Sequence, residues 1–170
     1  MKGSIRLWTA VAVAIFSILL SGCSSVDDDR VPLYDVYLRL DNYALWEKYG
    51  VFGYGDSRRF IRSERVPADY PYAITEFTGF GGILLVAGAD NGDYSAVLAY
   101  DLACPVEAKP TVRVYVDDET FDAVCPQCGS RYNVCEGFGG PVSGPAAERK
   151  YGLRRYRALL GDMGGYIIVP

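Results

Sequence analysis

Residues 83–101 are ILLVAGADNGDYSAVLAYD, and this stretch decides the fold class. It begins with a continuous apolar run at 83–87, which is short enough to be a strand buried on both faces. The Asn91-Gly92 pair between two aspartates is typical of a two-residue hairpin turn, whose central positions need positive φ. Residues 95–101 then return as the partner strand. The stretch is therefore predicted to form an antiparallel β-hairpin.

Short strands and tight turns are also indicated on both sides of this hairpin. Glycine-rich residues 161–165 indicate a closing hairpin, residues 42–49 a short helix or turn, and residues 136–145 a loop. The predicted strands are 33–40, 57–65, 83–87, 95–101, 112–116, 120–124, 131–134, 153–160 and 166–169. Because no long amphipathic helix is indicated, the pattern predicts an all-β chain that folds as an antiparallel sandwich or barrel.

The first residues have the pattern of an export signal. Lys2 and Arg6 precede an apolar run at 7–20, which ends in Ser21-Gly22-Cys23. The run has about 14 residues, whereas a helix that crosses a bilayer needs roughly 20, so a cleaved signal peptide at 1–22 is predicted. The Leu-Ser-Gly-Cys ending resembles the lipobox of bacterial lipoproteins, which implies that Cys23 is acylated and begins the mature chain. The alternative is an ordinary secretory signal that ends before an unrelated cysteine.

Residues 23–31 are predicted to be the acylated cysteine and an acidic tether. The serines and the three aspartates after Cys23 resemble the export tags of surface lipoproteins in the Bacteroidetes, and they also suit a solvated linker. Each buried methylene of an acyl chain contributes roughly 0.8 kcal/mol, so more than one chain gives lasting attachment. The expected location is the outer membrane, facing either the periplasm or the outside. The membrane itself is the expected partner, through the lipid on Cys23.

The mature chain is acidic and contains no histidine. Removal of residues 1–22 lowers Lys+Arg from 17 to 15 against 21 Asp+Glu, so the net charge changes from −4 to −6. An acidic chain is a poor partner for phosphate backbones, so no nucleic-acid partner is expected. The lack of histidine excludes Ser-His-Asp and Cys-His catalysis and imidazole metal ligands. The length after the tether suits one domain at 32–170, and enzymatic activity is not favoured.

Four cysteines follow Cys23, at positions 104, 125, 128 and 135. One setting is Cys104-Pro-Val-Glu after a predicted strand, and the other is Cys125-Pro-Gln-Cys128-Gly-Ser-Arg-Tyr. Over about 83–169 this order, with a later Gly-Pro loop and the final hairpin, resembles the Rieske iron–sulfur domain. In that family two loops bring C-x-H and C-x-x-H to a two-iron cluster. The resemblance implies a Rieske-like sandwich or barrel with a small loop-rich cluster subdomain, in which the two loops converge.

The ligand positions depart from the Rieske pattern. A Rieske cluster has two cysteines on one iron and two histidines on the other. Here Val106 stands in the place of the first histidine and Cys128 in the place of the second. Because valine cannot ligate a metal, a conventional Rieske centre is not possible in this chain. The resemblance therefore implies the fold and not the cofactor.

One interpretation of the cysteines is a metal site. Thiolates from Cys104, Cys125 and Cys128, with Cys135 as the predicted fourth ligand, can hold a tetrahedral zinc ion or an all-cysteine iron–sulfur cluster. On zinc, a carboxylate can replace the fourth thiolate. The two carboxylates close to the first cysteine in sequence are Glu107 and Asp101.

Two other interpretations use the same cysteines without a metal. A disulfide between the loops is expected for thiols of an exported protein, and the sequence cannot choose among the pairings. A redox pair at Cys125 and Cys128 is less favoured, because such pairs use a helix N-terminus and a strand is predicted here.

The sequence therefore predicts a cell-envelope lipoprotein with a degenerate cysteine site. In one form the site binds zinc or an iron–sulfur cluster, with an accessory role in electron transfer. In the alternative form, the protein is a non-enzymatic structural or binding lipoprotein whose loop cysteines are joined as a disulfide.

Overall fold

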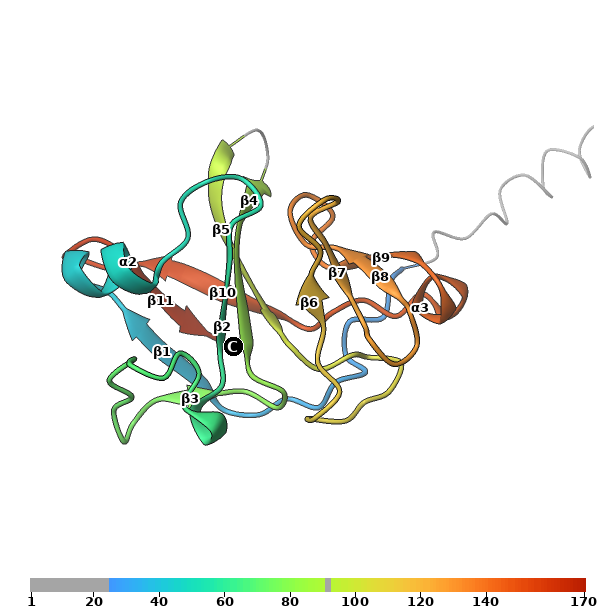
Figure 1. The fold of residues 1–170 in the computed structure, drawn as a ribbon, viewed down its shortest axis with the longest axis horizontal. Helices are drawn as coiled ribbons and strands as arrows, with labels where there is room; N and C mark the ends of the chain where they lie inside the picture. The colour runs from blue at the N-terminus through green and yellow to red at the C-terminus, as the bar shows by residue number, and fades with distance from the viewer. Residues whose placement is uncertain (1–24, 91–92) are drawn as a thin grey trace, which may run out of the picture.

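The computed structural model describes residues 25–90 and 93–170, which fold mainly as β-strands (Figure 1). The strands are β1 (Val36–Leu40), β2 (Ser57–Phe60), β3 (Phe77–Thr78), β4 (Ile83–Asp90), β5 (Asp93–Asp101), β6 (Tyr115–Val116), β7 (Asp122–Val124), β8 (Arg131–Asn133), β9 (Gly140–Ser143), β10 (Arg155–Leu160) and β11 (Tyr166–Val169). The helices are α2 (Tyr43–Tyr49), α3 (Pro145–Arg149) and the 3₁₀ helix η1 (Arg62–Glu64). The predicted all-β antiparallel class is confirmed.

The larger sheet forms the body of the molecule. Its seven strands have the order β2-β4-β5-β10-β11-β1-β3. The sheet curls into a nearly closed antiparallel barrel, on the left in Figure 1. Its edge strands β2 and β3 are only four and two residues long, and short edges limit pairing with other chains.

A second, smaller sheet lies beside the barrel, on the right in Figure 1. It has the order β6-β7-β8-β9, and its strands are two to four residues long. Because the strands are so short, loops make up much of this part of the molecule. A small loop-rich part of this kind was predicted beside the main sheet.

The two hairpins indicated by turn residues are both present. β4 and β5 pair antiparallel from Ile83 and Asp101 up to the turn, whose residues 91–92 lie outside the described part of the chain. β10 and β11 also pair antiparallel, and their last pair is Leu160 with Tyr166, which flank the glycine-rich turn. Both turns are local sequence signals, so both hairpins could be predicted without tertiary information.

The helix α2 occupies the segment in which a short helix or turn was expected. Its N-cap is Asn42, whose Oδ1 accepts a hydrogen bond of 2.9 Å from the N–H of Leu45. A cap of this kind satisfies one of the N–H groups left free at a helix start.

The region 136–145 was expected to be a loop, but it contains β9 and the start of α3. β9 includes Gly140 and Pro141, which are poor strand formers, and it exists because it pairs with β8. α3 begins at Pro145, which suits the first turn of a helix because proline has no N–H and an N–H at that position would have no partner within the helix. Tertiary pairing therefore overrides local preference in this segment.

β4 is buried on both faces, which explains its continuous apolar sequence. Ile83 and Leu85 belong to the core inside the barrel, whereas Leu84 and Val86 belong to a second core that extends to the cysteine loops. Successive residues of a strand point to opposite faces. Burial of one such side chain stabilises the fold by about 1.5–3 kcal/mol, so β4 supports both cores together.

The acidic segment before β1 lies against the folded domain. Asp27 forms a parallel bridge with Tyr151, and Val31 is fully buried. The guanidinium of Arg154 donates to the carbonyl oxygen of Val31. The segment expected to be a free tether, 23–31, is therefore part of the folded domain from Asp27 onward.

Candidate metal centre

Cys104 lies in the loop that follows β5. Its backbone N–H donates to the carbonyl oxygen of Val112 at 2.9 Å, and the N–H of Ala108 donates to the Cys104 carbonyl at 2.8 Å. The first bond joins the two sides of the loop, and the second closes a turn within it. These bonds fix the backbone at Cys104, whose side chain is fully buried.

Cys125 and Cys128 lie in the tight turn between β7 and β8. The N–H of Cys125 donates to the Ser130 carbonyl at 2.9 Å, and the N–H of Gly129 donates to the Cys125 carbonyl at 3.0 Å. Gly129 has φ +69°, a left-handed conformation that glycine adopts without strain. Cys125 is buried, whereas Cys128 is partly exposed. The turn thus carries one buried thiol and one partly exposed thiol.

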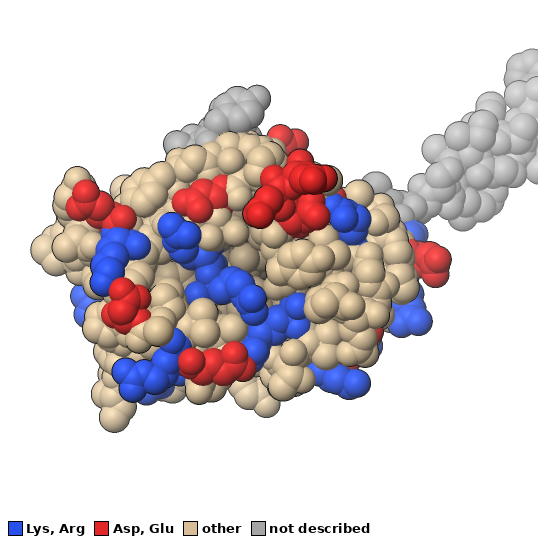
Figure 2. Space-filling model, viewed as in Figure 1, with Lys and Arg blue, Asp and Glu red and all other residues tan. Residues whose placement is uncertain are grey.

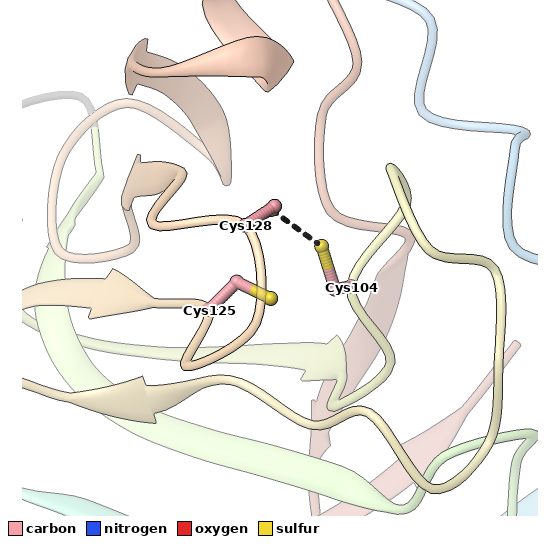
Figure 3. Close-up of side chains that lie close together, drawn as sticks. All are labelled: Cys104, Cys125 and Cys128. Carbon is pink, nitrogen blue, oxygen red and sulfur yellow. Dashed lines mark hydrogen bonds between the residues drawn. The ribbon is translucent and has the colours of Figure 1, made fainter.

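The two loops bring three sulfur atoms together (Figure 3). The Sγ atoms of Cys104, Cys125 and Cys128 all lie within 4.8 Å of one another, and those of Cys104 and Cys128 are 3.7 Å apart. A disulfide bond is about 2.05 Å long, and the described cysteines are all free thiols. The prediction that the loops converge is confirmed, and the three cysteines form a group that could bind a metal ion.

Backbone N–H groups surround the two buried sulfurs. The N–H groups of Glu107 and Val106 act to lower the pKa of Cys104 against the effect of burial. The N–H groups of Cys128 and Gln127 act in the same direction on Cys125. Hydrogen bonds to the charged form of a group stabilise that form, so these N–H groups oppose the larger effect of burial, which disfavours the thiolate.

Two side chains complete the polar surroundings of the group. Cys128 Sγ lies 3.1 Å from the Oγ of Ser130, which also accepts a hydrogen bond of 3.1 Å from the N–H of Ala146. Cys104 Sγ lies 3.4 Å from the hydroxyl of Tyr132, which is fully buried. Ser130 and Tyr132 therefore hold the sulfurs of the two loops in place.

The three thiols differ in acidity. Burial raises the pKa of Cys104 and raises the pKa of Cys125 to about 12. Burial also acts on Cys128, but hydrogen bonds from the side chain and backbone of Ser130 outweigh it, so the pKa of Cys128 lies below its usual value. Cys128 is therefore the thiol that ionises first, and a bound cation would favour ionisation of the other two.

Cys135 does not belong to this group. It lies beyond the far end of β8, whose extended residues each advance the chain by about 3.3 Å away from Cys128. Its Sγ contacts the carbonyl oxygen of Phe121 at 3.7 Å, and burial raises its pKa to about 11. The structure therefore brings together three of the four predicted ligands and leaves out Cys135.

The two carboxylates considered as alternative ligands have other partners. Asp101 is fully buried and accepts hydrogen bonds from the N–H groups of Gly81 and Ala103 and from the hydroxyl of Tyr156. Burial raises the pKa of Asp101. Glu107 accepts a hydrogen bond of 2.6 Å from Nε2 of Gln127, which braces the two cysteine loops against each other.

The residues present do not fit a Rieske cluster. Val106 packs against the second core and offers no ligand atom, and the second histidine position is occupied by Cys128. An all-cysteine iron–sulfur cluster needs four thiolates, and the described residues bring only three together. The geometry suits a single ion placed between the three sulfurs.

Fold and site together define an all-β protein with a three-cysteine centre between two loops. A scan against models of known protein families found no match, and a search of curated proteins found none. Within residues 25–90 and 93–170, no helix combines the length and apolar character that a membrane crossing requires. Cys23 and the predicted signal peptide at 1–22 lie outside the described residues.

Sequence reasoning missed the residues that support the sulfurs. Ser130, Tyr132 and Gln127 contact the group or its loops, but no role was predicted for them. A signal was present, because Ser130 and Tyr132 belong to the Gly-Ser-x-Tyr sequence that follows Cys128 directly. Residues that follow a cysteine pair so closely in the sequence are expected to lie close to its sulfur atoms.

Proposed function

We propose that the protein is a metal-binding lipoprotein of the bacterial cell envelope, in which Cys104, Cys125 and Cys128 hold one zinc ion. The observation that carries the proposal is the approach of the three sulfur atoms to within 4.8 Å of one another. Backbone N–H groups close to the two buried sulfurs also act in favour of the thiolate form, which is the form that ligates a metal. The ion would tie together two loops, one of which lies between the short strands β7 and β8.

Zinc is favoured over an iron–sulfur cluster by the number of ligands, because the described residues bring three thiols together and a cluster needs four. Zinc prefers four tetrahedral ligands with Zn–S distances of about 2.3 Å, which places two sulfurs roughly 3.8 Å apart. The 3.7 Å between the sulfurs of Cys104 and Cys128 agrees with this value. Zinc has no redox chemistry, so the protein role is structural, and an accessory role in electron transfer would require iron instead.

The cell-envelope location is part of the same proposal. It is supported by the signal-like sequence at 1–22 and by the lipobox-like residues that end in Cys23. The expected compartment is the outer membrane, with the lipid on Cys23 as the anchor and the membrane as the partner.

The charges on the surface do not favour binding to nucleic acid. On the face shown in Figure 2, a row of basic side chains is bordered by acidic ones. Arg113 is paired with Glu64, with 2.7 Å between Nη1 and Oε1. Mixed charge of this kind is a poor match for a phosphate backbone. We therefore predict that the protein does not bind nucleic acid.

One alternative function uses the same sulfurs. The 3.7 Å between the Sγ atoms of Cys104 and Cys128 is short enough for a small movement to form a disulfide. An oxidising compartment favours that bond. The protein would then be a structural or binding lipoprotein without a metal.

The proposal is tested by metal analysis of the full chain, purified in detergent, with Cys128→Ser and Cys135→Ser as a matched pair. We expect about one zinc ion per chain in the native protein and in Cys135→Ser, since Cys135 lies outside the group. Cys128→Ser should lose most of the zinc and should unfold at a lower temperature.

Each other result contradicts the zinc centre. An unchanged zinc content in Cys128→Ser would show that the ion is bound elsewhere. Iron with visible absorbance would support electron transfer instead. Absence of both metals, with two fewer titratable thiols before reduction than after it, would support the disulfide.

A further inference from the structure

The described residues supply three ligands to the proposed zinc ion, which prefers four. In the two described stretches, 25–90 and 93–170, the group that could hold a metal contains Cys104, Cys125 and Cys128 and no fourth donor. The whole sequence has no histidine. The fourth ligand therefore does not come from the described residues.

The polar side chains closest to the centre are engaged elsewhere. Asp101 is held by N–H groups and by Tyr156, and Glu107 is held by Gln127. The hydroxyl of Tyr132 is fully buried and lies 3.4 Å from Cys104 Sγ. Each of these groups would have to lose a hydrogen bond to become a ligand.

The centre is accessible from one side. Cys104 and Cys125 are 0% and 1% exposed, but Cys128 is partly exposed and lies between exposed Gln127 and exposed Gly129. Figure 3 shows the three side chains directed into the space between the two loops. An outside ligand can therefore approach over the Cys128 side of the turn.

The charge at the centre selects the kind of ligand. Three thiolates and one zinc ion carry one net negative charge, and the carboxylate of Glu107 is part of the brace between the two loops. A second negative charge next to three thiolates, two of which are buried, is costly. A neutral nitrogen donor adds no charge, and imidazole nitrogen binds zinc at about 2.0–2.1 Å.

We infer that the zinc ion keeps an open coordination position on the Cys128 side, and that this position takes a neutral nitrogen donor of the imidazole type from outside the chain. The inference rests on the proposed zinc centre. Through the open position, a second molecule can bind the zinc ion as its fourth ligand. Water occupies the position until the donor arrives.

The inference is tested with cobalt(II) in place of zinc, because cobalt has visible absorption that reports its ligands. The sample is the full chain with Cys23→Ser in detergent, since Cys23 lies outside the described residues and must be excluded as a ligand. Imidazole and azide are the neutral and anionic probes. We expect imidazole to shift the cobalt bands saturably, with an affinity at least about tenfold above that of azide, because azide adds a second negative charge next to the thiolates.

Glu107→Gln tests whether Glu107 supplies the fourth ligand. The amide keeps the size of the side chain and can still contact Gln127, but it supplies no carboxylate, so a saturable imidazole response should remain. A response that appears only in Glu107→Gln would show that Glu107 closes the site, and would overturn the inference.

Two further outcomes separate this inference from the proposed function. Stoichiometric cobalt binding without any response to imidazole would overturn the open position but leave the metal centre intact. Stronger binding of azide than of imidazole would overturn the choice of a neutral donor. Failure of the chain to bind cobalt or zinc would overturn the proposed centre itself.

Discussion

Asp101 connects the barrel to the cysteine loop through a single buried carboxylate. Its oxygens accept hydrogen bonds from the N–H groups of Phe80, Gly81 and Ala103, and Ala103 directly precedes Cys104. An added Cβ at Gly81 would meet Asp101 Oδ1 at 2.7 Å, so this backbone approach requires glycine. The position of the first sulfur thus depends on one acidic residue that does not touch it.

Asp101→Asn is expected to lower the free energy of unfolding by about 1–3 kcal/mol, because an amide NH₂ cannot accept from a buried N–H group. Urea denaturation measures the change. Asp162→Asn, in the exposed turn between β10 and β11, is the control and should change the midpoint little. Equal midpoints for the two variants would contradict the role of Asp101.

At the scale of elements, local turn signals predicted the long hairpins. The Asn-Gly sequence predicted the hairpin of β4 and β5, and the glycine-rich sequence at 161–165 predicted the hairpin of β10 and β11. β9 and α3 could not be predicted, because β9 depends on pairing with β8 rather than on its own residues. The same limit applies to Cys135, since its distance from the other sulfurs is set by the direction of β8.

The turn at Gly129 allows a prediction for one element. Gly129 has φ +69° and no atom within 4 Å of an added Cβ, so a substitution there tests backbone conformation without a clash. Gly129→Ala should weaken zinc binding and lower stability by roughly 1–2 kcal/mol, the cost of the left-handed conformation.

Gly129→Asn is the matched variant, because asparagine tolerates the left-handed region better than alanine. It should retain more zinc than Gly129→Ala when both are titrated with a competing chelator. If both variants bind zinc as the native chain does, the turn is not required to position Cys125 and Cys128.

For the whole molecule, the proposed attachment to the envelope depends on one residue, Cys23. Cys23→Ser should prevent acylation, so the variant should keep its signal peptide and lack the lipid. Metabolic labelling with a fatty acid, followed by gel electrophoresis, measures both effects. Globomycin treatment of cells with the native chain should also cause a precursor to accumulate. Labelling of Cys23→Ser equal to that of the native chain would refute the anchor.

The docking of Asp27 against Tyr151 limits how far an anchored molecule could move. Only residues 24–26 separate Cys23 from Asp27. Because an extended chain spans at most about 3.6 Å per residue, the linker from Cys23 to Asp27 would be at most roughly 14 Å long. The smaller sheet, which lies near this segment in Figure 1, would then sit close to the headgroups, with the barrel farther out. Molecules that move along the bilayer surface would meet the sulfurs more readily than molecules that approach from the bulk.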